Sequence, residues 1–179
     1  MNRYSYIKDY QKKDVTSAEY KMQDAVIAML LEGEGNISVR TVTERADVDR
    51  TTFYAYYDRI EDVYEAIEDE AVSDILEAED DESLDMFIEH LFSFFAENRK
   101  TVKAMIACQN RFSYLEKILT AVKYYISSRL TREYSIENEM LDNMISSSMT
   151  IPLLYYALEE RDVDLKTLQE KISRLLKRD

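Results

Sequence analysis

The sequence predicts an all-α protein. Its 179 residues include only two glycines and one proline, while 46% are hydrophobic and 33% are charged. This composition is typical of long helices joined by few turns. Apolar residues also recur at helical spacing along most of the chain. We expect a small N-terminal domain of three helices followed by a larger helical bundle.

The first full helix is predicted to begin near Thr16. Thr16 and Glu19 form a capping-box pattern, in which each side chain accepts a hydrogen bond from the other residue's backbone N–H. The apolar stripe that follows, at i, i+3, i+4, i+7 and i+8, consists of Met22, Ala25, Val26, Met29 and Leu30. Gly33 and Gly35 then predict the end of this helix.

Residues 38–57 predict two short helices joined by a tight turn. Ser38 and Asp49 are suitable N-caps, because their side-chain oxygens accept hydrogen bonds from free N–H groups at a helix start. The inward positions of the first short helix are Val39, Val42 and Ala46. In the second short helix, Phe53 and Tyr57 are four residues apart and predict a buried ridge.

The opposite face of the second short helix carries Arg50, Thr51, Tyr54, Ala55 and Tyr56. An arginine can bond guanine through two hydrogen bonds, a methyl group can contact thymine, and hydroxyls can bind phosphates. Two short helices with such a face on the second indicate a helix-turn-helix for the DNA major groove. Spacing alone does not separate this motif from helix pairs with no role in DNA binding.

Five features of residues 39–64 occur together in a fixed order. They are Val39-Arg40 at the first helix start, Ala46-Asp47-Val48 in the turn, Thr52-Phe53-Tyr54, the aromatic Tyr57, and Glu61-Asp62-Val63-Tyr64. With these features the chain resembles the tetracycline-repressor-like (TetR) family of bacterial transcriptional regulators over roughly residues 20–70. The resemblance implies a helix-turn-helix DNA-binding domain at residues 16–60 and a helical regulatory and dimerisation domain at residues 61–179.

Two positions depart from the family pattern. Asp47 stands where the family usually has glycine, and we expect the turn to persist because aspartate tolerates the left-handed conformation better than most residues. Ile60 stands where the family usually has a lysine that touches a phosphate. Arg59 is the neighbouring cation, but its side chain leaves a helix about 100° away from that of residue 60.

The resemblance and the groove chemistry together assign roles to seven residues. Those expected at base edges are Arg40, Arg50 and Thr51. Those expected at phosphates are Ser38, Thr52, Tyr54 and Tyr56.

Residues 1–15 form an N-terminal extension in which four cations alternate with tyrosines. Two interpretations remain open. The segment is a terminal turn packed by its tyrosines, or it is a basic arm that follows the DNA backbone or enters the minor groove.

The C-terminal domain is predicted to contain six helices. Their expected ranges are 60–78, 83–97, 101–109, 114–133, 136–161 and 165–177. Helix 83–97 is apolar on most of its circumference and is expected to be central. The resemblance implies that a C-terminal helix pair joins two subunits in a four-helix bundle, and that the helix from residue 60 sets the separation of two recognition helices about 34 Å apart.

The resemblance also implies a pocket for an unknown small-molecule effector in this domain. Aromatic and methionine side chains either line that pocket or fill the core. They are Phe87, Phe94, Phe95, Met105, Phe112, Tyr124, Tyr125, Met144 and Tyr155.

The net charge of −13 is unevenly distributed. Residues 1–60 carry a net charge of −1, and residues 61–179 carry −12. A nearly neutral DNA-binding domain predicts weak non-specific binding and a strong dependence on geometry and dimerisation.

The sequence offers little for catalysis. His90 is the only histidine, Cys108 the only cysteine, and there is no glycine-rich phosphate loop. We therefore expect no enzyme, no cofactor and no metal site, and we interpret His90 and Cys108 as packed side chains. The chain shows neither a signal peptide nor an apolar run of about 20 residues, so we expect a cytoplasmic protein without a membrane partner.

Two functions remain open from the sequence. The first is a homodimeric regulator, a repressor, that binds a palindromic double-stranded DNA operator and is released by a small-molecule effector. The alternative is a TetR-like adaptor that controls transcription through a protein coactivator and binds little DNA by itself.

Overall fold

The structure is a computed structural model. It describes residues 15–77, 83–108, 111–135 and 137–159, together with positions 167, 170 and 174. The predicted all-α fold is confirmed, because these residues form eight helices and contain no strand.

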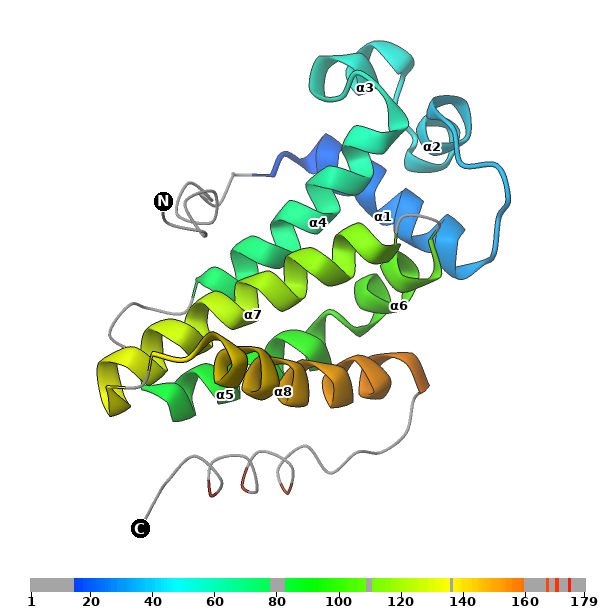
Figure 1. Cartoon of the computed structure of the whole chain (residues 1–179). Helices are drawn as coiled ribbons and strands as arrows, with labels where there is room; N and C mark the ends of the chain where they lie inside the picture. Colours follow the sequence, from blue (N-terminus) through cyan, green and yellow to red (C-terminus); the bar gives the residue numbers. More distant parts are fainter. Residues whose placement is uncertain are drawn as a thin grey trace.

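Two short helices, α2 and α3, and two longer ones, α1 and α4, make up the first part of the chain (Figure 1). They are α1 (Ser17–Leu31), α2 (Val39–Ala46), α3 (Arg50–Tyr56) and α4 (Ile60–Leu76). Four further helices complete the described body: α5 (Leu84–Glu97), α6 (Arg99–Ala107), α7 (Arg111–Tyr134) and α8 (Glu139–Glu159). We call α1 to α3 the reading head and the segment from α5 to α8 the body.

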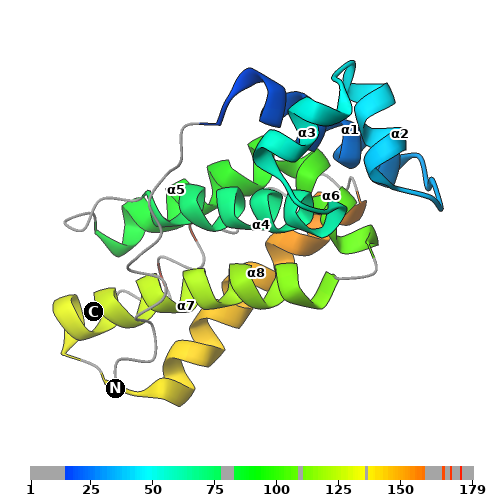
Figure 2. The same cartoon turned by 90° about the horizontal axis from the view of Figure 1, so that it is seen from above.

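The helix α4 connects the reading head to the body. Figure 1 shows α2 and α3 at one end of α4, while the rest of α4 runs beside α7. The helix α1 packs against α2, α3 and α4, and it also contacts α6 of the body. Figure 2 shows α7 and α8 side by side along one flank of the body. A shift of α4 against the body would therefore move the reading head.

The helix α5 lies at the centre of the body, as the sequence predicts. Its buried apolar residues are Leu84, Phe87, Ile88, Leu91, Phe92, Phe94 and Phe95. The ring of Phe87 stacks on Tyr125 of α7 with 4.5 Å between the centroids. Because α5 contacts α4, α6, α7 and α8, its apolar surface is covered on nearly every side.

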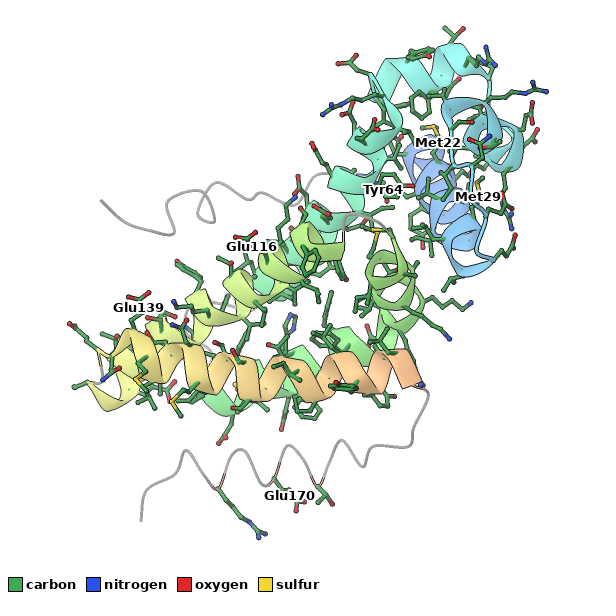
Figure 3. All side chains as sticks on the ribbon, turned by 45° about the vertical axis from the view of Figure 1, so that its right-hand side comes forward. Met22, Met29, Tyr64, Glu116, Glu139 and Glu170 are labelled. Carbon is green, nitrogen blue, oxygen red and sulfur yellow. The ribbon has the colours of Figure 1, made fainter. Side chains whose placement is uncertain are left out.

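The reading head shares one hydrophobic core with the body. Met22 and Met29 of α1 are buried, and Figure 3 shows them on the helix that supports α2 and α3. Phe53 of α3 and Val63 of α4 are fully buried in the same cluster. This continuous packing gives α3 a defined orientation relative to α4.

Most predicted helix boundaries agree with the structure within two or three residues. The helix α4 ends at Leu76, and α6 begins two residues before its predicted start. The predicted helix at 165–177 and the basic extension at 1–14 lie outside the described residues, as does most of the acidic run at 77–85. Among the helices that the structure describes, none is both long and apolar enough to cross a membrane.

Candidate nucleic-acid interface

The helix α2 begins at the predicted cap, Ser38. Its Oγ accepts a hydrogen bond from the Thr41 backbone N–H at 3.3 Å, and the Ser38 N–H donates to Thr41 Oγ1 at 3.0 Å. The Ser38 side chain is half-buried by this arrangement. Its predicted contact with a phosphate must therefore be made while the hydroxyl oxygen also caps α2.

The turn between α2 and α3 depends on Asp47. Asp47 has φ 53° and ψ 50°, which confirms the left-handed conformation predicted for this departure from glycine. The next residue, Val48, donates its N–H to the Thr43 carbonyl at 3.1 Å and closes the end of α2. This turn redirects the chain, so that α3 can cross α2 within a few residues.

The helix α3 is fixed by a cap and by two buried rings. Asp49 Oδ1 accepts a hydrogen bond from the Thr52 backbone N–H at 2.7 Å, and this bond holds the pKa of Asp49 below its ordinary value. Phe53 and Tyr57 are buried, and the Tyr57 hydroxyl accepts a hydrogen bond from Gln23 of α1 at 3.3 Å. Burial raises the pKa of Tyr57 above its ordinary value. The inner face of α3 is thus anchored on α1.

The outer face of α3 has the composition that the sequence predicts for a groove-reading surface. Arg50, Thr51, Tyr54 and Tyr56 are all exposed, whereas Thr52 is half-buried. The ring of Tyr54 packs edge-on against Phe53 with 5.5 Å between centroids, which restricts its motion. A guanidinium and three hydroxyl groups therefore face outward from one short helix.

Two arginines of α2 differ in their availability. Arg40 is exposed and its Nε donates to Glu44 Oε1 at 2.8 Å within the same helix. Arg45 is held more firmly, because it pairs with both Glu32 and Glu34 across the loop that precedes α2. The exposed Arg40 pair can open at little cost, so Arg40 stays available to an external partner.

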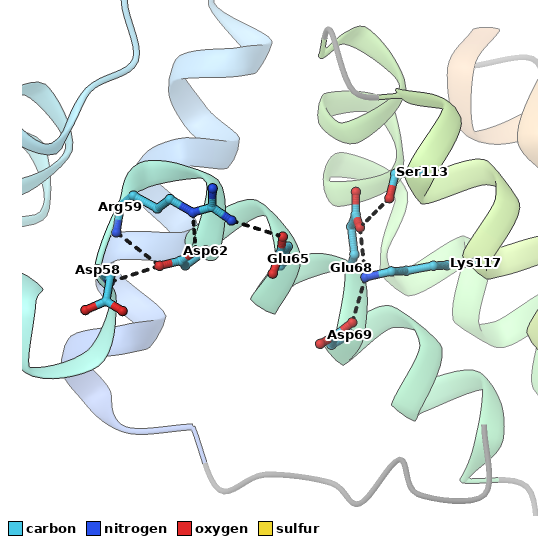
Figure 4. A network of polar contacts seen from close by, with 8 residues as sticks. All are labelled: Asp58, Arg59, Asp62, Glu65, Glu68, Asp69, Ser113 and Lys117. Atoms are coloured by element: carbon cyan, nitrogen blue, oxygen red, sulfur yellow. Dashed lines mark hydrogen bonds and ion pairs between the residues drawn. The ribbon is translucent and has the colours of Figure 1, made fainter. Parts of the chain in front are cut away.

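The start of α4 explains the second departure from the family pattern. Ile60 is half-buried and packs against the hydrophobic core. Arg59 donates from Nε to Asp62 Oδ1 at 2.9 Å and approaches Glu65 at 3.8 Å (Figure 4). The hydrogen bond from Arg59 lowers the pKa of Asp62. Arg59 is thus less available to an external partner than Arg40, because its partner Asp62 is 26% exposed whereas Glu44 is 62% exposed.

Arg50 is different from these arginines. It stands at the first position of α3, is exposed, and has no hydrogen bond, ion pair or ring contact with any residue that the structure describes. Its guanidinium is therefore fully available for an external partner.

A polar cluster joins α4 to the body (Figure 4). Glu68 of α4 is 1% exposed, and its Oε2 accepts from Lys117 Nζ and from Ser113 Oγ, both at 2.9 Å. Lys117 also donates to Asp69 at 2.8 Å. Burial lowers the pKa of Lys117, but hydrogen bonds to Asp69 and Glu68 outweigh burial and leave the pKa above its ordinary value. This cluster fixes α4 against α7.

Sequence reasoning missed this cluster, although a signal was present. Glu68 interrupts the apolar stripe of α4 formed by Val63, Ile67, Ala71, Val72 and Ile75. A carboxylate inside such a stripe indicates a buried charge that needs a partner. The partner, Lys117, lies far along the chain and has no local signature.

Several of the aromatic and methionine side chains for which the sequence left both a pocket and a core role open lie in the core. Phe87, Phe94, Phe95 and Met105 are buried in the main hydrophobic cluster, which agrees with the second of the two interpretations. His90 is half-buried, with Nε2 2.7 Å from the Asp74 carbonyl oxygen. The structure shows no cluster of metal-ligating side chains in the part of the chain that it describes.

The fold defined by these elements is that of the TetR family of transcriptional regulators, as the sequence resemblance implies. The sequence itself matches no family model and no curated protein. Three solved structures of this fold superpose on most of the chain. A TetR transcriptional regulator from Streptococcus agalactiae 2603V matches with a TM-score of 0.68 and 18% identity, covering 97% of this chain and 99% of that one.

The other two structures are equally divergent in sequence. A regulator of the TetR/AcrR family from Aquifex aeolicus VF5 gives a TM-score of 0.66 at 19% identity, over 89% of this chain and 97% of its own. The dihydroxyacetone kinase operon activator DhaS gives 0.68 at 14% identity, over 89% and 93% respectively. Because the sequence identity is so low, these matches establish the fold alone.

Proposed function

We propose that this chain is a transcription regulator that binds a palindromic DNA operator as a homodimer, most simply as a repressor, and is released by a small-molecule effector. The observation that carries the proposal is the free, exposed guanidinium of Arg50 at the start of α3. It projects from the helix that this fold presents to the major groove, where arginine bonds guanine with good geometry.

The remaining residues divide by chemistry between bases and phosphates. Besides Arg50, the proposal assigns Arg40 and Thr51 to contacts with base edges. The groups assigned to phosphates are Ser38, Thr52, Tyr54 and Tyr56. Because the half-buried Thr52 and the capping Ser38 are restrained, they suit fixed backbone contacts better than base readout.

The surface of α7 and α8 supports the homodimer. Exposed apolar side chains on one face of α8 are Met140, Met144, Ile151 and Tyr155. A groove between α7 and α8 is lined by the apolar Phe112, Leu115 and Leu119 and by six polar residues. Four exposed apolar side chains on one helix face favour burial against a second copy, which would place two reading heads for one operator.

One observation favours the alternative function, an adaptor that acts through a protein coactivator. In the described part of the reading head and the start of α4, Arg45 and Arg59 are held by carboxylates and Ile60 packs inward. Few cations then remain to bind phosphates. The likeness to DhaS, which is an operon activator, also leaves the direction of regulation open to either outcome.

Selection of bound duplexes from a random DNA pool tests the proposal. The wild-type protein should enrich a palindrome, and Arg50→Ala should relax one base position in each half-site by about 1–3 kcal/mol. Lys21→Ala removes the same charge from an exposed position on α1 and should leave the base preference unchanged. If the wild-type protein enriches no sequence even at low salt, direct operator reading is wrong and the coactivator function is favoured.

A further inference from the structure

Arg45, in the last turn of α2, binds two carboxylates at the end of α1. Its Nη1 donates to Glu32 Oε2 at 2.7 Å and to Glu34 Oε1 at 2.9 Å, and its Nη2 donates to Glu32 Oε1. The guanidinium therefore holds Glu32 at two points and Glu34 at one. We call these three side chains the head clamp.

The two carboxylates belong to a fixed part of α1. Glu32 is the C-cap of α1, and its N–H donates to the Ala28 carbonyl at 3.0 Å. Gly33 has φ 72°, and this left-handed residue lets the Glu34 N–H return to the Met29 carbonyl at 3.0 Å. Because both backbones are bonded to α1, the head clamp joins α2 to the end of α1 itself.

Packing fixes α2 through a short buried face. Of its eight residues, Val42, Thr43 and Ala46 are buried. The chain that leads into α2 is exposed over residues 31–36, and a Cβ added at either of its glycines would meet no atom within 4 Å. Because a short face gives a helix few packing anchors, its orientation depends more on the polar contacts at its ends.

The head clamp is exposed, so its strength depends on its geometry. The side chains of Arg45, Glu32 and Glu34 are 35%, 53% and 40% exposed. A single ion pair with such exposure contributes little, but a guanidinium that holds one carboxylate at two points and shares a second forms a network with defined geometry. The hydrogen bond from Arg45 also lowers the pKa of Glu32. The clamp can thus orient α2 while adding little to the stability of the fold.

The orientation of α2 determines how the proposed DNA contacts lie relative to one another. Ser38 and Arg40 stand at the opposite end of α2 from the head clamp, and Arg50 stands on α3. The helix α3 is anchored on α1 separately by its own buried rings. A rotation of α2 against α1 would therefore displace Ser38 and Arg40 relative to Arg50. Sequence-specific binding needs these groups in register with bases and phosphates at the same time.

We propose that Arg45 is a positioning residue for DNA recognition, which holds α2 through Glu32 and Glu34 and does not itself contact DNA. The role in recognition rests on the proposed function. Two other accounts of Arg45 predict different results. If Arg45 bound a phosphate, its charge would matter and its fork would not. If the carboxylates withheld Arg45 from DNA, removal of one of them would strengthen binding.

Amide hydrogen exchange of the full chain without DNA tests the clamp itself. The probes are the N–H groups of Glu34 and Val48, which lie on either side of the clamp and each donate to a backbone carbonyl. Glu32→Gln keeps the shape of the side chain, removes its charge and should lower the protection of these amides about fivefold. Glu44→Gln removes the same charge from α2 outside the clamp and should leave protection within about twofold of the wild type. Unchanged protection in Glu32→Gln would overturn the proposal.

Competition between a duplex selected by the wild type and a scrambled duplex tests the role in recognition. Arg45→Lys keeps the charge but loses the fork, whereas Glu32→Gln makes the protein less negative. Both variants should bind the selected duplex about fivefold more weakly or worse, with no loss for the scrambled duplex and an unchanged salt slope. Glu44→Gln makes the same change of charge and should bind the selected duplex at least as tightly as the wild type.

The outcomes separate the proposal from the other accounts. Wild-type affinity in Arg45→Lys would show a phosphate contact and overturn the positioning role. Tighter binding by Glu32→Gln would show that the carboxylate withholds Arg45 from DNA, and it would overturn the role as well. If the wild type selects no duplex while Glu32→Gln still lowers the protection of Val48, the operator function fails and the role in recognition fails with it, whereas the clamp stands.

Discussion

The buried pair of Glu68 and Lys117 provides a quantitative test of how α4 is held on the body. Lys117→Met keeps a similar apolar stem and removes one of the two donors to a carboxylate that is 1% exposed. Removing one partner of a fully buried pair costs about 3–5 kcal/mol. The Lys117 side chain is 28% exposed, so water can partly replace it, and we expect a loss of about 2 kcal/mol. This corresponds to roughly a 30-fold change in the unfolding equilibrium.

Urea denaturation followed by circular dichroism, at one fixed protein concentration, measures this loss. Lys123→Met is the control on the same helix, because its Nζ lies 3.4 Å from Glu139, whose side chain is 58% exposed. The control should lose less than about 1 kcal/mol. Combining Lys117→Met with Glu68→Leu should restore most of the stability, since no buried charge then remains unpaired. Equal losses in the two lysine variants would refute the argument.

Three further predictions concern the turn, alkaline stability and the dimer. Glycine adopts the left-handed conformation of residue 47 without a steric cost, so Asp47→Gly should raise the free energy of unfolding by up to about 1 kcal/mol, whereas Asp47→Ala should lower it. The reverse order in urea titrations would contradict this account of the turn. Because the pKa of Tyr114 is raised, the unfolded chain loses this proton above about pH 10 while the folded chain keeps it, and stability falls as pH rises. Tyr114→Phe should reduce that slope by up to about 1.4 kcal/mol per pH unit, as measured by denaturation at several alkaline pH values. An unchanged slope would contradict the burial of this hydroxyl. Met144 is 58% exposed on α8, and Met144→Lys should give monomers in sedimentation. Met86 is 53% exposed on α5, and Met86→Lys should leave the dimer intact. Dimers in both variants would exclude this face of α8 as the dimer interface.

Local signals in the sequence predicted much of the reading head. The capping box of Thr16 and Glu19 is formed, with the Thr16 N–H bonded to Glu19 at 2.9 Å. Asp49 caps α3, and Asp47 takes the left-handed conformation. Such features depend on residues within one helical turn of each other, so their physical causes are visible in a short stretch of sequence.

Contacts between distant residues were not predictable in the same way. The partner of Glu68 is 49 residues away, and the contact between α1 and α6 joins helices that are far apart in the sequence. Arg45 and Arg59 are cations in the sequence, but only the folded chain shows which carboxylates hold them. Which arginine is left without a carboxylate partner is therefore a property of the tertiary structure, although Arg50 itself was already predicted from the sequence as a base-edge residue.

The central claim is that the isolated protein discriminates between DNA sequences through α3. Competition binding, followed by fluorescence anisotropy, measures this directly with a duplex from the selection and a scrambled duplex of equal length, at two salt concentrations. The account predicts a preference of about 10³ or more for the selected duplex, reduced in Arg50→Ala, and a shallow salt dependence because few phosphates are neutralised. Wild-type affinities for the two duplexes that differ by less than about tenfold would contradict it.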